Sequence, residues 1–236
     1  MGDTNKVVFG IEKVVVWPIL SEDADTGTPT YGTKISVPGA RSLSMDFQGD
    51  IEKYYADNVV YYQTLTQAGE YQGDLTIYNV PEAFLTQIMM QVKNHDGVIM
   101  ENSEQEPREF AMAFEFSGDR NKMRHLLYKV KATKPAIGGS TVEENKEPEE
   151  QTLNLSATPR LDNKMVRVKV AEGDAAYDDW YEEPYEFTAD EYEAVQAPTG
   201  NPSTSGYYEK VNEVYVASAD TTVDQAKTYY TIKSTP

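Results

Sequence analysis

The 236-residue chain has no cysteine, two histidines and two tryptophans. Without cysteine it can form neither disulfides nor thiolate metal sites, which fits synthesis in a reducing cytoplasm. No apolar run approaches the ~20 residues that span a bilayer. The first residues also lack the charged and apolar regions of a secretory signal. We therefore expect neither a leader nor membrane insertion.

Basic residues are scarce and unevenly distributed. Residues 1–171 hold 25 acids and 18 bases, whereas residues 172–236 hold 14 acids and 3 bases. The formal net charge of −18 and the lack of Lys/Arg-rich runs argue against nucleic-acid binding, because phosphates would be repelled. The shift in charge after residue 171 indicates a separate C-terminal part.

Short segments with period-two alternation run through the first 170 residues. In one of them, Val166, Val168 and Val170 alternate with Arg167 and Lys169. Similar or strand-like patterns occupy residues 6–20, 33–48, 54–65, 71–80, 110–116, 126–133 and 152–158. Such alternation is typical of half-buried antiparallel strands, with one face on a core and one polar face.

Residues 81–93 break this pattern. Apolar side chains recur there at helical spacing, at Phe84, Leu85, Ile88, Met89 and Val92. Pro81 suits a first helical turn, where its missing N–H costs nothing. The sequence therefore predicts a mainly β fold, a β-sandwich or open barrel, with one flanking helix at about 81–93.

A long hairpin is predicted at about 41–63, with Gly49-Asp50-Ile51-Glu52-Lys53 at its tip. It has more apolar residues than a free hairpin needs, while its acidic residues keep it soluble. The candidate assembly residues are Leu43, Met45, Phe47, Asp50, Glu52, Tyr54 and Tyr55, with Asp46 among the solubilising acids. We predict that this hairpin is an assembly element that becomes ordered on association.

The remaining segments are predicted to be a polar acidic loop, a linker and a small module. The loop spans 138–151, the linker 186–206 and the β module 207–236, leaving residues 1–185 as the main β domain. Pro and Gly punctuate the linker, and tyrosines mark the module. We expect the 194–236 segment to be a dispensable exterior appendage.

No catalytic, cofactor or metal site is predicted. His95 lies in an Asn-His-Asp-Gly turn and His125 opens a strand, both ordinary places for histidine. The acidic clusters 143–150 and 178–183 lack the spacing of a calcium loop, and charge runs are usually solvated faces. Gly138-Gly139-Ser140-Thr141 lacks the lysine of a phosphate loop.

An ordered set of stretches resembles the major tail proteins of siphophages that infect Gram-positive bacteria. They are KVVFGIEKV at 6–14, VPGARSLS at 37–44, YYADNVVYY at 54–62, YQGDLTIYNVP at 71–81, EPREFAMAFEFSGDRNKMRHLLYKVKATKP at 106–135 and QTLNLSATPR at 151–160. The resemblance covers about residues 1–185. The C-terminal segment is similar to a small accessory module of various phage structural proteins.

The resemblance implies the tail-tube fold and no enzymatic activity. Six subunits would join into a ring with a β-lined lumen, and rings would stack into a DNA-conducting tube of the virion tail, made in the bacterial host cytoplasm. Implied partners are other copies of the chain, the tape measure protein, the tail terminator and distal tail proteins. DNA would pass without specific binding, so an acidic lumen is expected. Asp46, Asp50, Glu52 and Asp57 are candidate lumen-facing acids.

Two alternatives remain from the residues alone. An adhesin-like or capsid-decorating β-sandwich would bind a surface ligand and stay monomeric or form a small closed oligomer. A glycan-active enzyme would need a cleft with two carboxylates, one with a raised pKa. Polymerisation into tubes of uniform bore separates the tail-tube reading from both.

Overall fold

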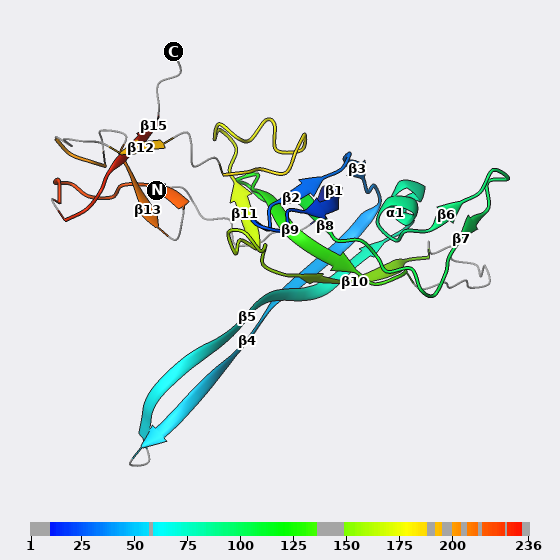
Figure 1. Cartoon of the computed structure of the whole chain (residues 1–236), viewed down its shortest axis with the longest axis horizontal. Helices are drawn as coiled ribbons and strands as arrows, with labels where there is room; N and C mark the ends of the chain where they lie inside the picture. Colours follow the sequence, from blue (N-terminus) through cyan, green and yellow to red (C-terminus); the bar gives the residue numbers. More distant parts are fainter. Residues whose placement is uncertain are drawn as a thin grey trace. The chain divides into compact units, whose positions relative to one another are not determined.

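Strands dominate the computed structural model, which describes residues 10–56, 59–135, 149–187, 192–194, 200–203, 207–211, 214–224 and 226–232. The prediction of a mainly β fold is confirmed (Figure 1). The chain divides into two units, residues 1–185 and 186–236. Across the described ranges, no helix combines the length and apolar character needed to cross a membrane.

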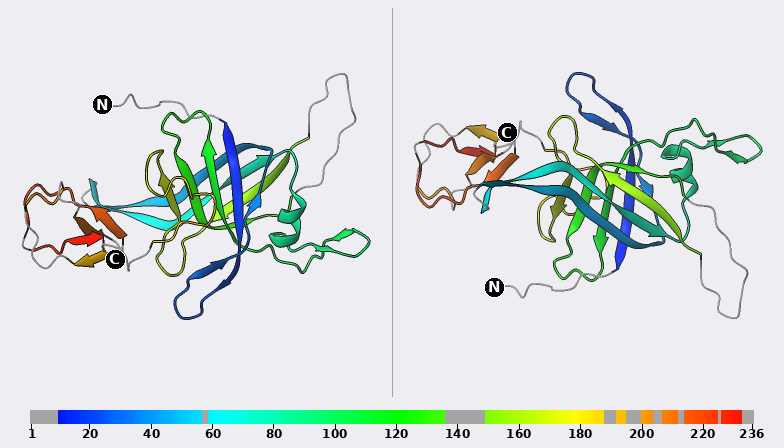
Figure 2. Two further views of the ribbon diagram at one scale, coloured as in Figure 1. Left: turned by 90° about the horizontal axis from the view of Figure 1, so that it is seen from above. Right: turned by 90° about the horizontal axis from the view of Figure 1, so that it is seen from below.

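The first unit is built on a nine-stranded open sheet. Its strands are β1 (Ile11–Glu22), β2 (Pro29–Tyr31), β3 (Ile35–Ser36), β4 (Ala40–Ala56), β5 (Val59–Ile77), β8 (Phe110–Phe116), β9 (Arg124–Ala132), β10 (Gln151–Ala157) and β11 (Arg167–Val170). The hydrogen-bonded order is β2-β1-β8-β9-β10-β5-β4, with β3 also beside β1 and β11 beside β9. Among the described residues the path ends at β2 and β4 without closing, as the curled sheet in Figure 2 shows.

One face of the sheet encloses the main hydrophobic core. Strands from both flanks contribute to it, β1 and β8 on one side and β10 and β5 on the other. The helix α1 (Glu82–Gln87) adds Phe84, whose ring packs edge-on against Phe110 at 5.6 Å. The alternation read from the sequence in β10 is observed, with Leu153, Leu155 and Ala157 buried in this core.

The opposite face of β1, β8 and β9 is also buried, which the alternation did not predict. A second cluster there contains Trp17, Ala111, Ala113 and Tyr128. Residues 171–185, called the strap here, cover it with Tyr177 and Trp180. Because both faces of β8 are packed, six of its seven residues are buried.

The strap is held by specific hydrogen bonds as well as by packing. The Trp17 indole donates to the Glu182 carbonyl oxygen at 3.3 Å, and the Trp180 indole donates to the His125 carbonyl oxygen at 3.4 Å. The Tyr128 hydroxyl donates to the Tyr185 carbonyl oxygen at 2.6 Å. The strap is therefore an integral part of the first unit.

The predicted single apolar face of β9 is wrong. Leu126 and Tyr128 lie in the second cluster, whereas Val130 and Ala132 lie in the main core. The cause is a register shift between β8 and β9, which lets the strand change faces. Lys129 falls on the polar side of the 126–133 alternation, but it is buried between Glu22 at 2.7 Å and Glu109 at 3.2 Å.

The helix is shorter than the predicted 81–93. It ends at Gln87, and Met90 has a left-handed backbone with φ of 59°, which interrupts helical geometry. The following residues form a small hairpin of β6 (Val92–Lys93) and β7 (Ile99–Met100). The buried Ile88 and Met89 produced the apolar stripe, but they reach the core from the turn after the helix.

The second unit contains a four-stranded sheet in the order β12-β15-β13-β14. Its strands are β12 (Tyr192–Ala194), β13 (Tyr208–Val211), β14 (Val214–Ala217) and β15 (Tyr230–Ile232). Tyr229 is buried, and its hydroxyl donates to Asp220 at 2.6 Å. The predicted 186–206 linker is not purely a connector, because β12 lies within it and pairs with β15.

Candidate assembly surfaces

The β4–β5 pair extends far beyond the sheet. β4 pairs with β5 from Ala40 to Ala56, but β10 pairs with β5 only over Tyr71–Ile77. Residues 49–67 thus form a two-stranded ribbon that leaves the sheet, with no third strand beside it among the described residues (Figure 1). We call these residues the ribbon.

The predicted tip at residues 49–53 is wrong. These residues lie within β4, where Gly49 is opposite Gln67 and Lys53 is opposite Gln63. Gly49 marks a register shift rather than a turn, and the ladder continues until Ala56 pairs with Val59. Residues 57–58, and with them Asp57, lie outside the described residues.

The predicted assembly residues occupy two different environments. Leu43 and Met45 are half-buried against the main core, so they anchor the base of the ribbon. Phe47 is exposed and contacts Tyr71 edge-on at 5.3 Å. Asp46 is exposed on the opposite, polar face of β4.

The outer end of the ribbon carries exposed aromatic side chains. Tyr54 and Tyr62 face each other across the strands with ring centroids 6.1 Å apart. The register then skips Tyr61, a bulge that presents this side chain with 81% of its surface exposed. Asp50, Glu52 and Tyr55 are placed by their backbone pairing only, opposite Thr66, Thr64 and Val60. We call Tyr54, Val59, Tyr61 and Tyr62 the ribbon tip.

At Gly73 the backbones of β4 and β5 approach each other closely, and this close approach fixes the base of the ribbon. It lies between Met45 of β4 and Leu155 of β10 in the sheet register. A Cβ atom at this position would meet the Ser44 carbonyl oxygen at 1.8 Å and its carbon at 2.6 Å. Both are backbone atoms that cannot rotate away, so only glycine fits without separating β4 from β5.

Gly73→Ala is expected to destabilise the first unit by about 3 kcal/mol, because the backbone must shift to admit the methyl group. Thermal unfolding followed by circular dichroism should show Tm lowered by about 10 °C. Gly97→Ala is the control, since nothing lies within 4 Å of its added carbon and only its positive φ opposes the change. That strain costs about 1 kcal/mol. Equal effects at both positions would contradict the close-approach argument.

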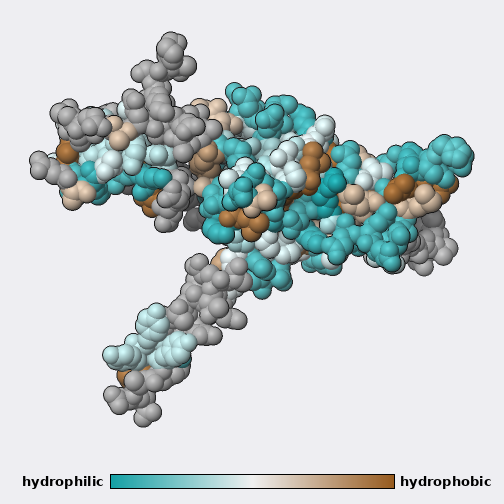
Figure 3. Space-filling model, in the orientation of Figure 1, coloured by the Kyte–Doolittle hydropathy of each residue, from teal (hydrophilic) through white to brown (hydrophobic). Residues whose placement is uncertain are grey.

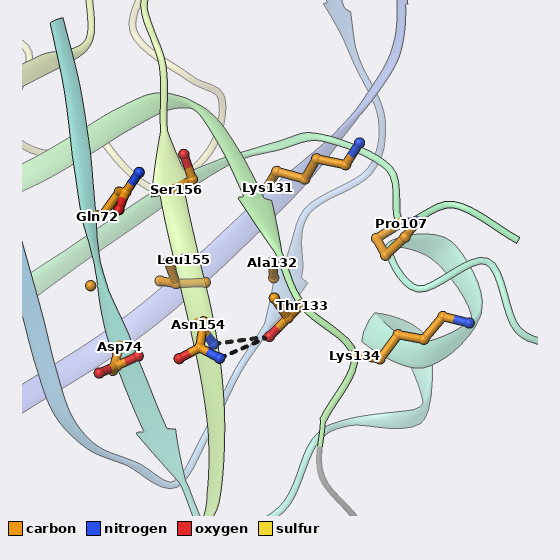
Figure 4. Close-up of a pocket in the computed structure, with 11 residues that line it drawn as sticks. Gln72, Asp74, Pro107, Lys131, Ala132, Thr133, Lys134, Asn154, Leu155 and Ser156 are labelled. Atoms are coloured by element: carbon orange, nitrogen blue, oxygen red, sulfur yellow. Dashed lines mark hydrogen bonds between the residues drawn. The ribbon is translucent and has the colours of Figure 1, made fainter. Parts of the chain in front are cut away.

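The polar face of β5, β10 and β9 contains an open hollow of about 970 Å³ (Figure 4). Asn154 lies at its centre and donates to the Thr133 hydroxyl at 3.4 Å, with Lys131 and Lys134 near its rim. Asp74 is the only carboxylate among the described residues that line it. The described lining of the hollow therefore offers one carboxylate, whereas glycoside hydrolysis uses two.

A charge network around the buried Glu115 ties the strap to the sheet. Glu115 accepts from Lys13 at 2.6 Å and from Arg124 at 3.1 Å, and the Tyr181 hydroxyl donates to it at 3.1 Å. Burial alone would raise the pKa of Glu115, but the hydrogen bonds from Lys13 and Arg124 outweigh it and lower that pKa. Arg124 also stacks over the Tyr177 ring at 3.6 Å. The network is structural, since every member has a partner within the fold.

The two histidines have different surroundings. His125 is stacked on Phe114 at 5.3 Å, and burial, then nearby Arg167 and Lys169, lowers its pKa to about 4. His95 is exposed in its turn. No cluster of three or more His, Asp or Glu residues in the described part of the chain is arranged to hold a metal. The 138–148 part of the acidic loop lies outside the described residues.

The sequence reading missed one exposed apolar surface, on the β6–β7 hairpin. Val92, Val98 and Met100 are 50%, 53% and 47% exposed. Apolar side chains gather at this end of the first unit in Figure 3. The triplet Val98-Ile99-Met100 after the Asn-His-Asp-Gly turn was the available signal. Val92 was instead assigned to a buried helix stripe.

Comparison with known proteins gives one family match. A family model described as "Phage tail tube protein" matches residues 2–199. No curated protein sequence matches the chain. One similar solved structure is the sheath–tube complex of an extracellular contractile injection system, PVC, in its extended state, with TM-score 0.40, 12% identity, and 70% of this chain and 93% of that chain covered. Another is the tube-terminating cap of the anti-feeding prophage, with TM-score 0.35, 13% identity, and 72% and 96% coverage. The family match covers most of the sequence, and the chain belongs to the phage tail tube protein family.

Proposed function

We propose that this chain is the major subunit of the tube of a long, non-contractile phage tail. Six copies close into a ring, and rings stack into a conduit through which DNA leaves. The family match over residues 2–199 carries the tube role. The ribbon supports self-association, because exposed aromatic side chains on an extended strand pair are a usual sign of a binding surface.

The open sheet also supports ring formation. Its path ends at β2 and β4, which leaves strand edges that invite pairing with another chain. In a ring each edge would meet the edge of a neighbour, and a closed ring has no edge left over. A closed sheet between subunits would then protect the tube from uncontrolled aggregation.

Charge supports a passive role toward DNA. The chain carries a formal net charge of −18, and Asp46 and Asp74 are exposed on the polar face of β4 and β5. Acids that face a bore repel phosphates and let the duplex slide without binding. The proposed lumen-facing acids remain Asp46, Asp50, Glu52 and Asp57. We add Asp74, because it is exposed on the same polar face of the sheet as Asp46.

Other proposed partners follow from the tube role. The tape measure protein would occupy the bore before DNA, and the tail terminator and distal tail proteins would contact the ends of the tube. The chain would be made in the cytoplasm of the bacterial host and enter the virion tail without catalysing a reaction.

The test is assembly of the purified full-length chain across a wide range of concentration. Sedimentation velocity should show monomers giving way to rings and larger species, and electron microscopy should show tubes of uniform bore. Monomer at every concentration, even with tail partners added, would refute the proposal. Small closed oligomers that never extend would favour a capsid-decorating or adhesin-like module instead.

A further inference from the structure

The β6–β7 hairpin presents an apolar surface on one of its two faces. Val92 and Met100 are directly opposite each other in the register. The Asn94 N–H donates to the Val98 carbonyl oxygen at 3.0 Å, which extends the same ladder by one pair. Alternation therefore places Val92, Val98 and Met100 on one face and Ile99 with Lys93 on the other. We call Val92, Val98 and Met100 the β6–β7 patch.

Polar groups beside the patch and on the back of the hairpin are already paired with one another. Lys93 contacts Glu82 at 2.5 Å. Glu101 accepts from Gln91 at 2.7 Å and contacts Lys134 at 3.0 Å. A partner that covers the apolar side chains therefore leaves no unsatisfied charge behind at these positions. An apolar centre with a polar rim is the usual form of a protein interface.

The ribbon tip is a second exposed surface, and it lies far from the first. β4 spans seventeen residues from Ala40 at the sheet to Ala56 at the tip, about 50 Å in extended geometry. The β6–β7 hairpin follows β5 and α1 at the other end of this strand pair. Figures 1 and 2 place the ribbon and β6–β7 on opposite sides of the sheet. One molecule therefore cannot cover its own patch with its own ribbon.

We propose that the β6–β7 patch of one subunit receives the ribbon tip of a second copy of this chain. Two different surfaces at opposite ends of a subunit meet only in a head-to-tail contact, and such contacts generate rings or open-ended filaments. The length of the ribbon suits a contact between stacked subunits. Tyrosine rings pack on Val and Met while their hydroxyl groups reach the polar rim. This inference rests on the proposed tube function and adds the acceptor surface to it.

Disulfide cross-linking tests the contact directly, since the chain has no cysteine of its own. Tyr61→Cys protein and Met100→Cys protein are mixed, assembled and oxidised. A covalent dimer is expected in the mixture and not in either variant alone. Ile99→Cys replaces Met100→Cys in the control and should give at least about tenfold less dimer, because it faces away from the patch. A dimer from Tyr61→Cys alone, or none from the mixture, would overturn the proposal.

A second measurement uses Val92→Ser combined with Met100→Ser. This variant should raise the concentration at which tubes appear by roughly tenfold or more, because it removes apolar groups from the centre of an interface. Ile99→Ser is the matched control and should assemble as the wild type does. If tubes appear at the same concentration in the wild type and the double variant, this contact is overturned and the tube function still stands. A wild type that never assembles would overturn both.

Discussion

A chain without the ribbon is expected to fold and to form no tubes. Residues 50–66 can be replaced by an Asn-Gly turn, because Gly49 and Gln67 are opposite each other and this dipeptide closes a two-residue hairpin. The removed residues have no paired strand in the rest of the described sheet, so the core loses little. Thermal unfolding should stay within about 2 °C of the wild type, while electron microscopy should show monomers only.

A full-length ribbon with Tyr54→Ser, Tyr61→Ser and Tyr62→Ser separates the role of the side chains from that of length. This variant keeps the backbone arm and should also fail to form tubes, because the aromatic anchors are gone. If the shortened chain polymerises at the wild-type concentration, the ribbon is not an assembly element. If only the tyrosine variant polymerises, backbone pairing along the ribbon carries the contact.

Removal of the strap is expected to unfold the first unit. A chain ending after Val170 lacks Tyr177, Trp180 and Tyr181, which exposes the second cluster and leaves Glu115 without its tyrosine partner. Losing one buried Trp costs about 3–5 kcal/mol, and whole domains are stable by about 5–15 kcal/mol. Circular dichroism should show no cooperative transition. Trp180→Ala in the full chain should lower Tm by about 10 °C.

A chain ending after Tyr185 is the matched control. It keeps the strap and its hydrogen bonds to Trp17 and Tyr128, and it removes the second unit completely. We expect wild-type melting of the first unit and continued tube formation, since the C-terminal unit is predicted to be dispensable. Ending the chain at residue 193 is less clean, because it divides β12. Loss of tubes in the 1–185 chain would show that the second unit takes part in assembly.

Alternation predicted much of the sheet, because it depends only on nearest neighbours along a strand. Leu153, Leu155 and Ala157 face the core as the pattern indicates. The pattern failed where a third layer covers the polar side. Small residues such as Ala111 and Ala113 leave room for the strap, but the sequence around them does not indicate that another segment covers them. The tryptophan and tyrosines within the acidic 177–185 segment were the signal that this stretch is not simply solvated.

The position of the candidate assembly surfaces was predicted in part. The hairpin was located, but its tip was placed too early because Gly49-Asp50 has turn chemistry. Pairing between Tyr54 and Tyr62 outweighs that local preference. Leu43 and Met45 were assigned to a partner, although they pack on the core of their own subunit. The β6–β7 patch was hidden because helical spacing around Val92 suggested one continuous buried stripe.

The order of strands in the chain has a consequence for synthesis. β4 and β5 are neighbours in sequence and can pair as soon as both leave the ribosome. β1 must wait for β8, since Ile11 pairs with Phe116. The helix before the β6–β7 patch packs its Phe84 into a core that also needs Leu153 and Leu155. A nascent chain therefore exposes its ribbon well before its β6–β7 patch is held in place, so the docking proposed above must wait until translation has passed β10.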